Sequence, residues 1–278
     1  MSTSPYSTLV MLSLICALLC APQTPAPAEV AAGVIAEYKT ADALAQVSVW
    51  QKQLTHPDGN PQFKEYRDAR LKEFAATEFA PYRLYNPALA AQVRAVLLPV
   101  LRLYGRQDGF DIIVIDSPVP VMMNDSAVLL MVSTGLLERA TSDDELLGHV
   151  AHELGHDLHW RRTASARAIK ARHEAAGTPG APEAVAARAD LARIELECDA
   201  FSAVTLAALG RNPLPFACFL EATARDFPDY LDPDLPPVSL RVKVMTAVVP
   251  VAARGGAVQI SAEFKQLKAR LALRKNMK

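Results

Sequence analysis

The sequence has little that would mark a nucleic-acid-binding protein or a disulfide-stabilised one. Its 278 residues carry 29 Lys and Arg against 30 Asp and Glu, so nothing in the charge balance points to nucleic acid. Only four residues are Cys. Two of these fall in the leader described next, which leaves Cys198 and Cys218, too few for a disulfide framework; whether they pair stays open. Hydrophobic residues, by contrast, make up 51% of the chain, which is ample for one sizeable core.

The N-terminal apolar run is too short to be a typical membrane span. Residues 9–19 have the length of a signal-peptide core, below the roughly 20 residues that a bilayer needs. Ala26-Pro27-Ala28 supplies a small-x-small cleavage site, although residues 1–8 contain no Lys or Arg. We therefore predict a signal peptide over residues 1–28 and an exported, periplasmic protein. An uncleaved anchor and a lipid anchor on Cys20 are the alternatives.

The strongest candidate functional residues lie in one short segment that contains the pattern His-Glu-x-x-His, formed by His152, Glu153 and His156. On an α-helix, residues four apart lie about 6 Å apart along the axis and about 40° round it, so both imidazoles can bind one ion. Glu153 points to the flank, where it can hold an ion-bound water and take its proton. The pattern is typical of zinc metalloproteases. His149 and His159 lie on nearly the same face and are expected to line the cleft.

The flanking residues predict the helix that this spacing requires. Ser142 and Glu145 have the form of a capping box, and early acids suit the positive end of the helix dipole. Apolar residues recur beside the His stripe at helical intervals: Leu146, Leu147, Val150, Ala151, Leu154 and Leu158. The alternative is a core helix whose polar stripe faces solvent and binds no metal.

A tetrahedral catalytic site needs a third protein ligand and one open position. Glu195 and Asp199 are four residues apart and therefore lie on one face of a second helix. Glu195 can bind the ion while Asp199 contacts a ligating His, and Glu197 points to the other side. A solvated acidic helix face is the alternative interpretation.

The segment between these two motifs has to bend. If one straight helix ran from His156 to the turn at residues 177–180 and another returned, His156 would lie about 31 Å from the turn and Glu195 only about 22 Å. We therefore predict a break between Trp160 and His173.

Taken in order, several segments resemble the signatures of one family. They are residues 124–137, 144–148, 151–156 and 195–199. They are similar to motifs of the zinc metallopeptidases that include HtpX, BepA and the CAAX prenyl endopeptidase, called minigluzincins. The resemblance covers about residues 86–245. It implies a zinc endopeptidase with one Zn²⁺ per chain, held by His152, His156 and Glu195, with Glu153 as general base. It also implies that an edge strand, here residues 128–133, holds a polypeptide substrate in extended form.

Two positions near the C-terminus bear on catalysis. Residues 235–242 resemble a His-Pro-Pro segment of the family and the Arg that follows it. Arg241 matches that Arg, as a candidate catalytic residue or as part of a structural ion pair. Leu235 stands where the family has a His near the metal, which leaves Tyr230 or Arg241 to supply the contact. Because losing a donor aimed at the oxyanion weakens catalysis, a peptide-binding or chaperone-like zinc module is the alternative function.

The predicted fold class is α+β, mostly helical and gluzincin-like, with a small, mainly antiparallel sheet packed on the His-Glu-x-x-His helix. Residues 30–105 read as helical. Short β-branched runs predict strands at residues 111–116, 118–123 and 128–133. Pro118 and Pro120 are expected near a sheet edge, where missing N–H donors are tolerated.

The chain is expected to contain one metallopeptidase domain over residues 29–278. Its parts are a helical region, a core and a C-terminal extension, at residues 29–85, 86–245 and 246–278. Residues 264–278 form a basic amphipathic stretch, which is compatible with a membrane-surface helix or with a solvated terminal helix. The function predicted from the whole sequence is hydrolysis of peptide bonds in unfolded or extended segments by zinc-activated water.

Overall fold

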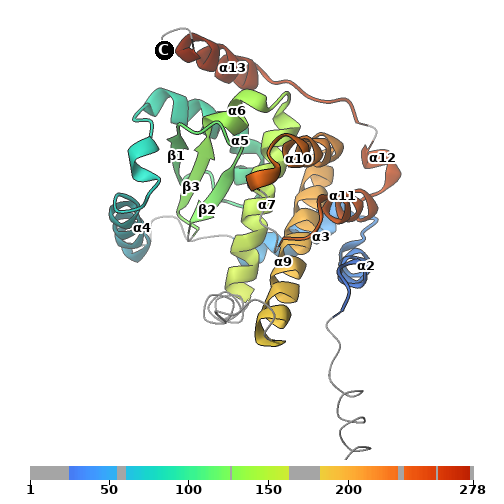
Figure 1. Cartoon of the computed structure of the whole chain (residues 1–278). Helices are drawn as coiled ribbons and strands as arrows, with labels where there is room; N and C mark the ends of the chain where they lie inside the picture. Colours follow the sequence, from blue (N-terminus) through green and yellow to red (C-terminus); the bar gives the residue numbers. More distant parts are fainter. Residues whose placement is uncertain are drawn as a thin grey trace, which may run out of the picture.

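The computed structural model describes residues 25–54, 61–125, 127–162, 182–230, 235–254 and 256–275. Helices make up most of this part, and its strands form one three-stranded sheet (Figure 1). The predicted α+β class with a small sheet is therefore confirmed at this level.

The sheet is mixed rather than mainly antiparallel. Its strands are β1 (Asp111–Ile115), β2 (Met122–Asp125) and β3 (Leu129–Ser133), in the order β1-β3-β2. β1 pairs with β3 in parallel, and β2 pairs with β3 antiparallel. The reason lies in the intervening loop, where Pro118 and Pro120 lack the N–H groups that a neighbouring strand would need. The chain therefore leaves β1 and joins the sheet again on the far side of β3.

The prediction that residues 128–133 form an edge strand is wrong. β3 is the central strand, with partners on both sides, and all five of its residues are buried. A continuous apolar run is typical of a strand covered on both faces. The edge nearer the His-Glu-x-x-His helix belongs to β2, which is more polar and only half-buried (Figure 1).

Two helices cover the inner face of the sheet. α5 (Pro87–Leu103) packs against β1, and α7 (Asp143–Arg162) packs against β2 and α5. Asn86 caps α5 by accepting the Leu89 N–H at 3.0 Å. The outer face packs against the end of α4 (Pro61–Phe74), where Phe74 joins a smaller apolar cluster with Ile113, Ile115, Val128, Leu129 and Met131. A 3₁₀ turn, η1 (Ala80–Tyr82), follows α4.

A second helical layer lies on the side of α7 away from β2. Its centre is α9 (Pro182–Ala208), which runs beside α7 and contacts α2 (Pro27–Tyr38), α3 (Ala43–Leu54) and α11 (Val238–Ala247) (Figure 1). Aromatic rings fill the junction: the Phe201 ring centroid lies 4.5 Å from that of Trp50 and 5.3 Å from that of Tyr104. α10 (Leu214–Asp226) packs on α7, and η2 (Pro228–Tyr230) follows it.

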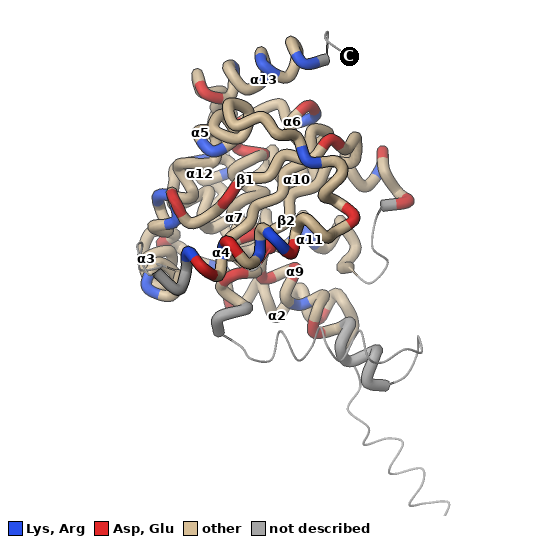
Figure 2. Tube along the Cα trace, turned by 90° about the vertical axis from the view of Figure 1, so that its left-hand side faces the viewer, with Lys and Arg blue, Asp and Glu red and all other residues tan. Residues whose placement is uncertain are grey.

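The C-terminal helix is docked onto the rest of the molecule. After α12 (Val251–Arg254), α13 (Ala262–Lys275) lies on α5 and α6 (Thr134–Arg139). Phe264, Leu267 and Leu271 are buried, so most of the apolar face of this predicted helix is packed against protein. Basic and acidic positions are interspersed along the chain trace (Figure 2).

Some predictions fall outside the described residues. These are the apolar run at residues 9–19, Cys20, and most of the predicted break between Trp160 and His173; α7 ends at Arg162 and α9 begins at Pro182. Helix α2 begins at Pro27, within the predicted cleavage site. Among the described helices, none has the length and apolar character needed to cross a membrane.

Candidate metal centre

The helix that carries the His-Glu-x-x-His pattern, α7, starts where the sequence predicts, at Asp143. Ser142 Oγ accepts the Glu145 N–H at 3.4 Å, as in a capping box. The Glu145 carboxylate, however, accepts from the N–H and hydroxyl of Thr141 at 2.8 and 2.5 Å, one residue earlier than the box requires. The start of α7 is therefore fixed by side chains on both sides of the expected cap.

A close crossing of α7 and α9 brings the two motifs together. A Cβ atom at Gly155 would lie 2.9 Å from Cys198 Cα and 3.0 Å from Cys198 Sγ. Real Cβ atoms essentially never lie less than 3.0 Å from another residue's backbone atom, so Gly155 allows the two helices to approach this closely. Since Gly155 lies between His152 and His156, and Cys198 lies between Glu195 and Asp199, the crossing sets all four side chains face to face.

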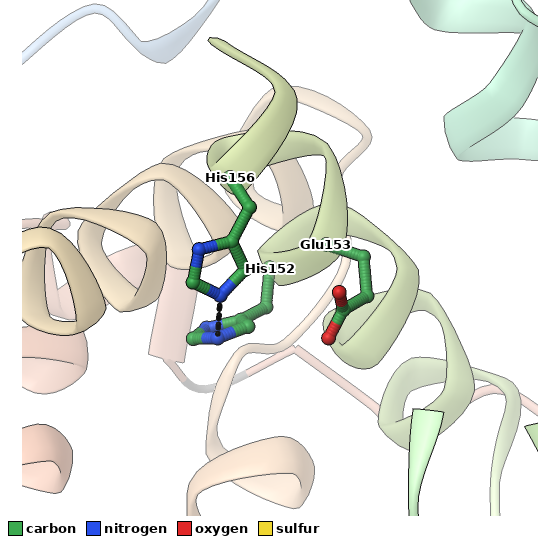
Figure 3. A group of neighbouring side chains, drawn as sticks. All are labelled: His152, Glu153 and His156. Carbon is green, nitrogen blue, oxygen red and sulfur yellow. Dashed lines mark hydrogen bonds between the residues drawn. The ribbon is translucent and has the colours of Figure 1, made fainter. Parts of the chain in front are cut away.

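The three predicted ligands converge. Nε2 of His152 and Nε2 of His156 are 3.1 Å apart (Figure 3). Glu195 Oε2 lies 3.4 Å from His152 Nε2, and Glu195 Oε1 lies 3.3 Å from His156 Nε2. Ligand atoms about 2.0–2.1 Å from a tetrahedral zinc would be separated by about 3.3–3.4 Å. The donor set and its spacing therefore fit such an ion.

Asp199 orients His152 from behind. Its Oδ1 lies 3.0 Å from His152 Nδ1, and the carboxylate is fully buried. A proton on Nδ1 would be held by this contact, which leaves the Nε2 lone pair facing Glu195 and His156. The predicted position of Asp199 next to a ligating His is the one that the structure shows.

Arg241 lies in the site but faces carboxylates. Its Nε and a terminal nitrogen donate to the two oxygens of Asp199 at 2.8 and 2.9 Å, and a terminal nitrogen lies 3.7 Å from Glu195 Oε2. This bidentate geometry is the strong form of an Arg–carboxylate pair. It matches the structural alternative for Arg241, whereas its catalytic role stays a prediction.

The electrostatics of the centre favour a bound positive charge. Burial opposes a charge on His152, but hydrogen bonds and Coulomb attraction from Asp199 and Glu195 raise its pKa to about 10. Burial would likewise raise the pKa of Glu195, yet the neighbouring His156, His152 and Arg241 hold that pKa well below its usual range. A site with this balance stabilises a cation between the imidazoles and the carboxylate.

Glu153 is held beside the ligand pair by a residue that sequence analysis did not assign a role. Its carboxylate lies near the two imidazoles in Figure 3 and accepts the backbone N–H of Asn124 at 2.9 Å. The Asn124 side chain donates to the Glu153 carbonyl at 3.0 Å. Burial raises the pKa of Glu153. The available signal was an Asn within a strand, where that residue type is uncommon.

A buried ion pair behind the site was also missed. Arg106 is fully buried and pairs with Asp157, the residue after His156. It also donates to the Ala127 carbonyl at 2.6 Å. Ala127 has a φ of 63° in the turn between β2 and β3. Arg106 thus ties this turn to the end of the His-Glu-x-x-His segment. Nothing local in the sequence indicates a pairing over this distance.

Neither of the two additional His residues points at the centre. His149 Nδ1 lies 2.8 Å from the Glu145 carbonyl, and its ring packs edge-on against Phe216 and Phe219. His159 Nε2 lies 3.1 Å from Glu197 Oε2. His149 thus packs against the Phe residues of α10, and His159 contacts a carboxylate of α9. Glu197 does point away from the ligands, as expected.

Other candidates contribute less. Cys198 is buried, Cys218 is exposed, and both are free thiols. Leu235 is half-buried, and residues 231–234 just before it and the side chain of Tyr230 lie outside the described part.

The chain matches no protein-family model and no curated protein in the comparisons. Function is therefore inferred from the site's residues and their geometry.

Proposed function

We propose that the protein is a zinc-dependent endopeptidase of the exported compartment that hydrolyses peptide bonds in unfolded or extended polypeptides. The observation that carries this proposal is the convergence of His152, His156 and Glu195, with ligand atoms 3.1–3.4 Å apart, beside the Glu153 carboxylate. The minigluzincin resemblance of the motifs supports the same function.

His152, His156 and Glu195 would hold the ion, with Asp199 and Arg241 fixing His152 and Glu195 from behind. When bound, zinc supplies a Lewis acid that polarises a carbonyl and makes water more acidic. The protein fixes the positions of these three side chains before the ion binds, because they lie on two helices that pack tightly against each other.

Glu153 is placed to move the proton. Its carboxylate stands beside the ligand pair, and the Asn124 N–H fixes it at 2.9 Å. Burial raises its pKa, which brings its basicity closer to neutral pH, where a general base is most effective. In this position Glu153 accepts a proton from the attacking water and returns it to the leaving amine.

The free edge of β2 provides a place for the substrate backbone. In an antiparallel pair, successive residues direct their N–H and C=O groups alternately toward and away from the partner strand. Ser133 donates to the Val121 carbonyl at 3.0 Å, so Val121 and Met123 face β3 while Met122 and Asn124 face outward. The Asn124 N–H already donates to Glu153, so the N–H and C=O of Met122 and the C=O of Asn124 are the outward-facing groups that remain for a partner. An extended polypeptide can add to this edge through these groups, next to Glu153.

The decisive experiment compares wild type with Glu153→Gln, using casein as an unstructured substrate and elemental analysis of metal. We expect about one zinc per chain in both proteins. Casein degradation should fall about 100-fold or more in the variant, because a positioned general base contributes about 10²–10⁴-fold. Equal degradation by both proteins, or protein purified without chelator that holds no transition metal, would overturn the proposal.

The second candidate is a zinc-bearing peptide-binding or chaperone-like module. It is favoured by one observation, that Leu235 cannot donate a hydrogen bond to an oxyanion. This alternative predicts that zinc-loaded protein suppresses aggregation of unfolded casein without cutting it, and that Glu153→Gln does so equally well.

A further inference from the structure

An apolar cavity lies beside the free edge of β2. Its volume is about 520 Å³, and its walls come from η1, from the loop of residues 116–121 and from the end of α10. Apolar side chains dominate the lining: Phe79, Val119, Val121, Met123 and Phe227. Cavities of roughly this size, about 300–1,000 Å³, are typical of sites that bury apolar ligand groups.

Met123 connects the cavity to the substrate edge. Side chains along a strand point alternately to opposite faces of a sheet. Met122 is buried in the large core, and Asn124 reaches Glu153, so both lie on the α7 side. Val121 and Met123 point to the other face, where they line the cavity. The cavity and the metal centre thus lie on opposite faces of the same short strand.

A polypeptide paired with β2 would present side chains to both faces. Residues directly opposite each other in paired strands point to the same side. The side chain opposite Met123 would therefore enter the cavity, while its neighbours in sequence would face α7 and the ligands. An extended chain rises about 3.4 Å per residue. The substrate residue opposite Met123 would therefore lie about one to three residues, along the substrate, from the part that faces Asn124 and Glu153.

The cavity walls are fixed before any ligand arrives. The loop is held by Asp116 N–H donating to the Tyr82 carbonyl at 2.8 Å and by Val121 N–H donating to Ser133 Oγ at 2.9 Å. Near the start of the loop, Gly135 N–H also donates to the Ser117 carbonyl at 2.8 Å. A preformed cavity keeps the cost of ordering low when a side chain enters.

We propose that this cavity is a specificity subsite that binds one large apolar side chain, aromatic or long aliphatic, of an extended polypeptide paired with β2. This inference rests on the proposed function, because it takes β2 as the substrate edge. The one charged side chain in the described lining, Asp116, pairs with Arg274. The substrate class is therefore unfolded polypeptide with a large apolar residue about one to three residues from the bond that is cut.

The test measures binding, so that it does not depend on catalysis. The probe is a labelled, unstructured peptide of alternating Thr and Ser in which one residue at a time is changed to Phe. Its binding to zinc-loaded Glu153→Gln is followed by fluorescence anisotropy. We expect at least one Phe position to tighten binding about tenfold, as expected for burial of an aromatic side chain.

Variants that fill the cavity provide the control. Val119→Trp fills the cavity from the loop, and Thr223→Trp fills it from α10. Two variants are used so that the test still stands if one of them fails to fold. Val251→Trp is the matched control, because Val251 is exposed and lies on α12. Each is made in the Glu153→Gln background. The gain from Phe should disappear in both filled variants and persist in Val251→Trp.

The subsite is overturned if Phe tightens binding at no position, or if the gain survives in both filled variants. These outcomes are separate from failure of the proposed function. A protein that cuts casein in a Glu153-dependent manner but shows no Phe preference keeps the function and loses the subsite. A protein that cuts nothing but shows the cavity-dependent Phe preference keeps the subsite and loses the function.

Discussion

His149 illustrates how surroundings set the charge of a single side chain. Burial lowers its pKa to about 4, and its Nδ1 faces the Glu145 carbonyl. His152, one turn along the same helix, has its pKa raised by Asp199 and Glu195. The pKa values of two His residues on one helix are thus shifted in opposite directions, because one contacts carboxylates and the other contacts aromatic rings.

We expect the stability of the protein to depend on pH through His149. An unfolded His has a pKa of about 6.5, above the folded value, so below that pH the unfolded chain binds the proton first. The stabilisation that comes from keeping His149 neutral is complete above pH 6.5 and is lost as the pH falls toward 4. Over this window the free energy of unfolding of the wild type should fall by about 2 kcal/mol more than that of His149→Gln, a figure that is discounted for partial exposure. Urea unfolding of both proteins in chelator measures the difference; parallel loss would contradict it.

At the scale of elements, the crossing of α7 over α9 determines whether a site exists. Local patterns in the sequence were enough to predict both helices, their four-residue spacings and the convergence of Glu195 with the His pair. They were not enough to predict strand order, because the pairing of β1 with β3 depends on where a proline-containing loop takes the chain. The edge strand beside the His-Glu-x-x-His helix was therefore misassigned by one strand.

Gly155→Ala tests the crossing directly. Its new Cβ would lie about 3 Å from Cys198 atoms, so α9 must shift and the ligands separate. We expect about 1–3 kcal/mol loss of stability, as in overpacked cores, and weaker zinc binding in chelator competition. Gly33→Ala is the matched control, since a Cβ there meets nothing within 4 Å; it should be neutral or stabilising by up to about 1 kcal/mol. Equal behaviour of the two variants would show that the crossing is not tight.

Over the whole molecule, long-range side-chain contacts hold the layers together, and these were the least predictable part. Arg106 reaches Asp157, and Arg241 reaches Asp199, across 51 and 42 residues. No periodicity or local motif encodes such pairs, because they depend on the finished packing. α13 is another case: its pattern predicted an amphipathic helix but not the surface that it covers. Lys268 Nζ donates to the carbonyls of Glu138 and Ala140 at 2.6 and 2.9 Å, at the end of α6.

Docking of α13 should contribute measurably to global stability. Leu267 is fully buried in this contact, whereas Leu273 on the same helix is 66% exposed. Leu267→Ala should cost about 2–5 kcal/mol, and Leu273→Ala should change stability by less than about 0.5 kcal/mol. Urea denaturation of the two variants against wild type gives both values. If Leu267→Ala were as mild as Leu273→Ala, α13 would be detached in solution.

The short length of β2 has a consequence for how long a bound chain stays. With four residues, the strand spans about 14 Å and offers few outward-facing main-chain groups. Its last residue, Asp125, is held by Arg70 at 2.6 and 2.8 Å, and charged side chains at strand ends discourage further pairing. On the proposed function, a polypeptide paired with so short an edge would form few main-chain hydrogen bonds, and its cleaved fragments would dissociate quickly. Such an edge would suit repeated cleavage better than long-lived binding of unfolded chains.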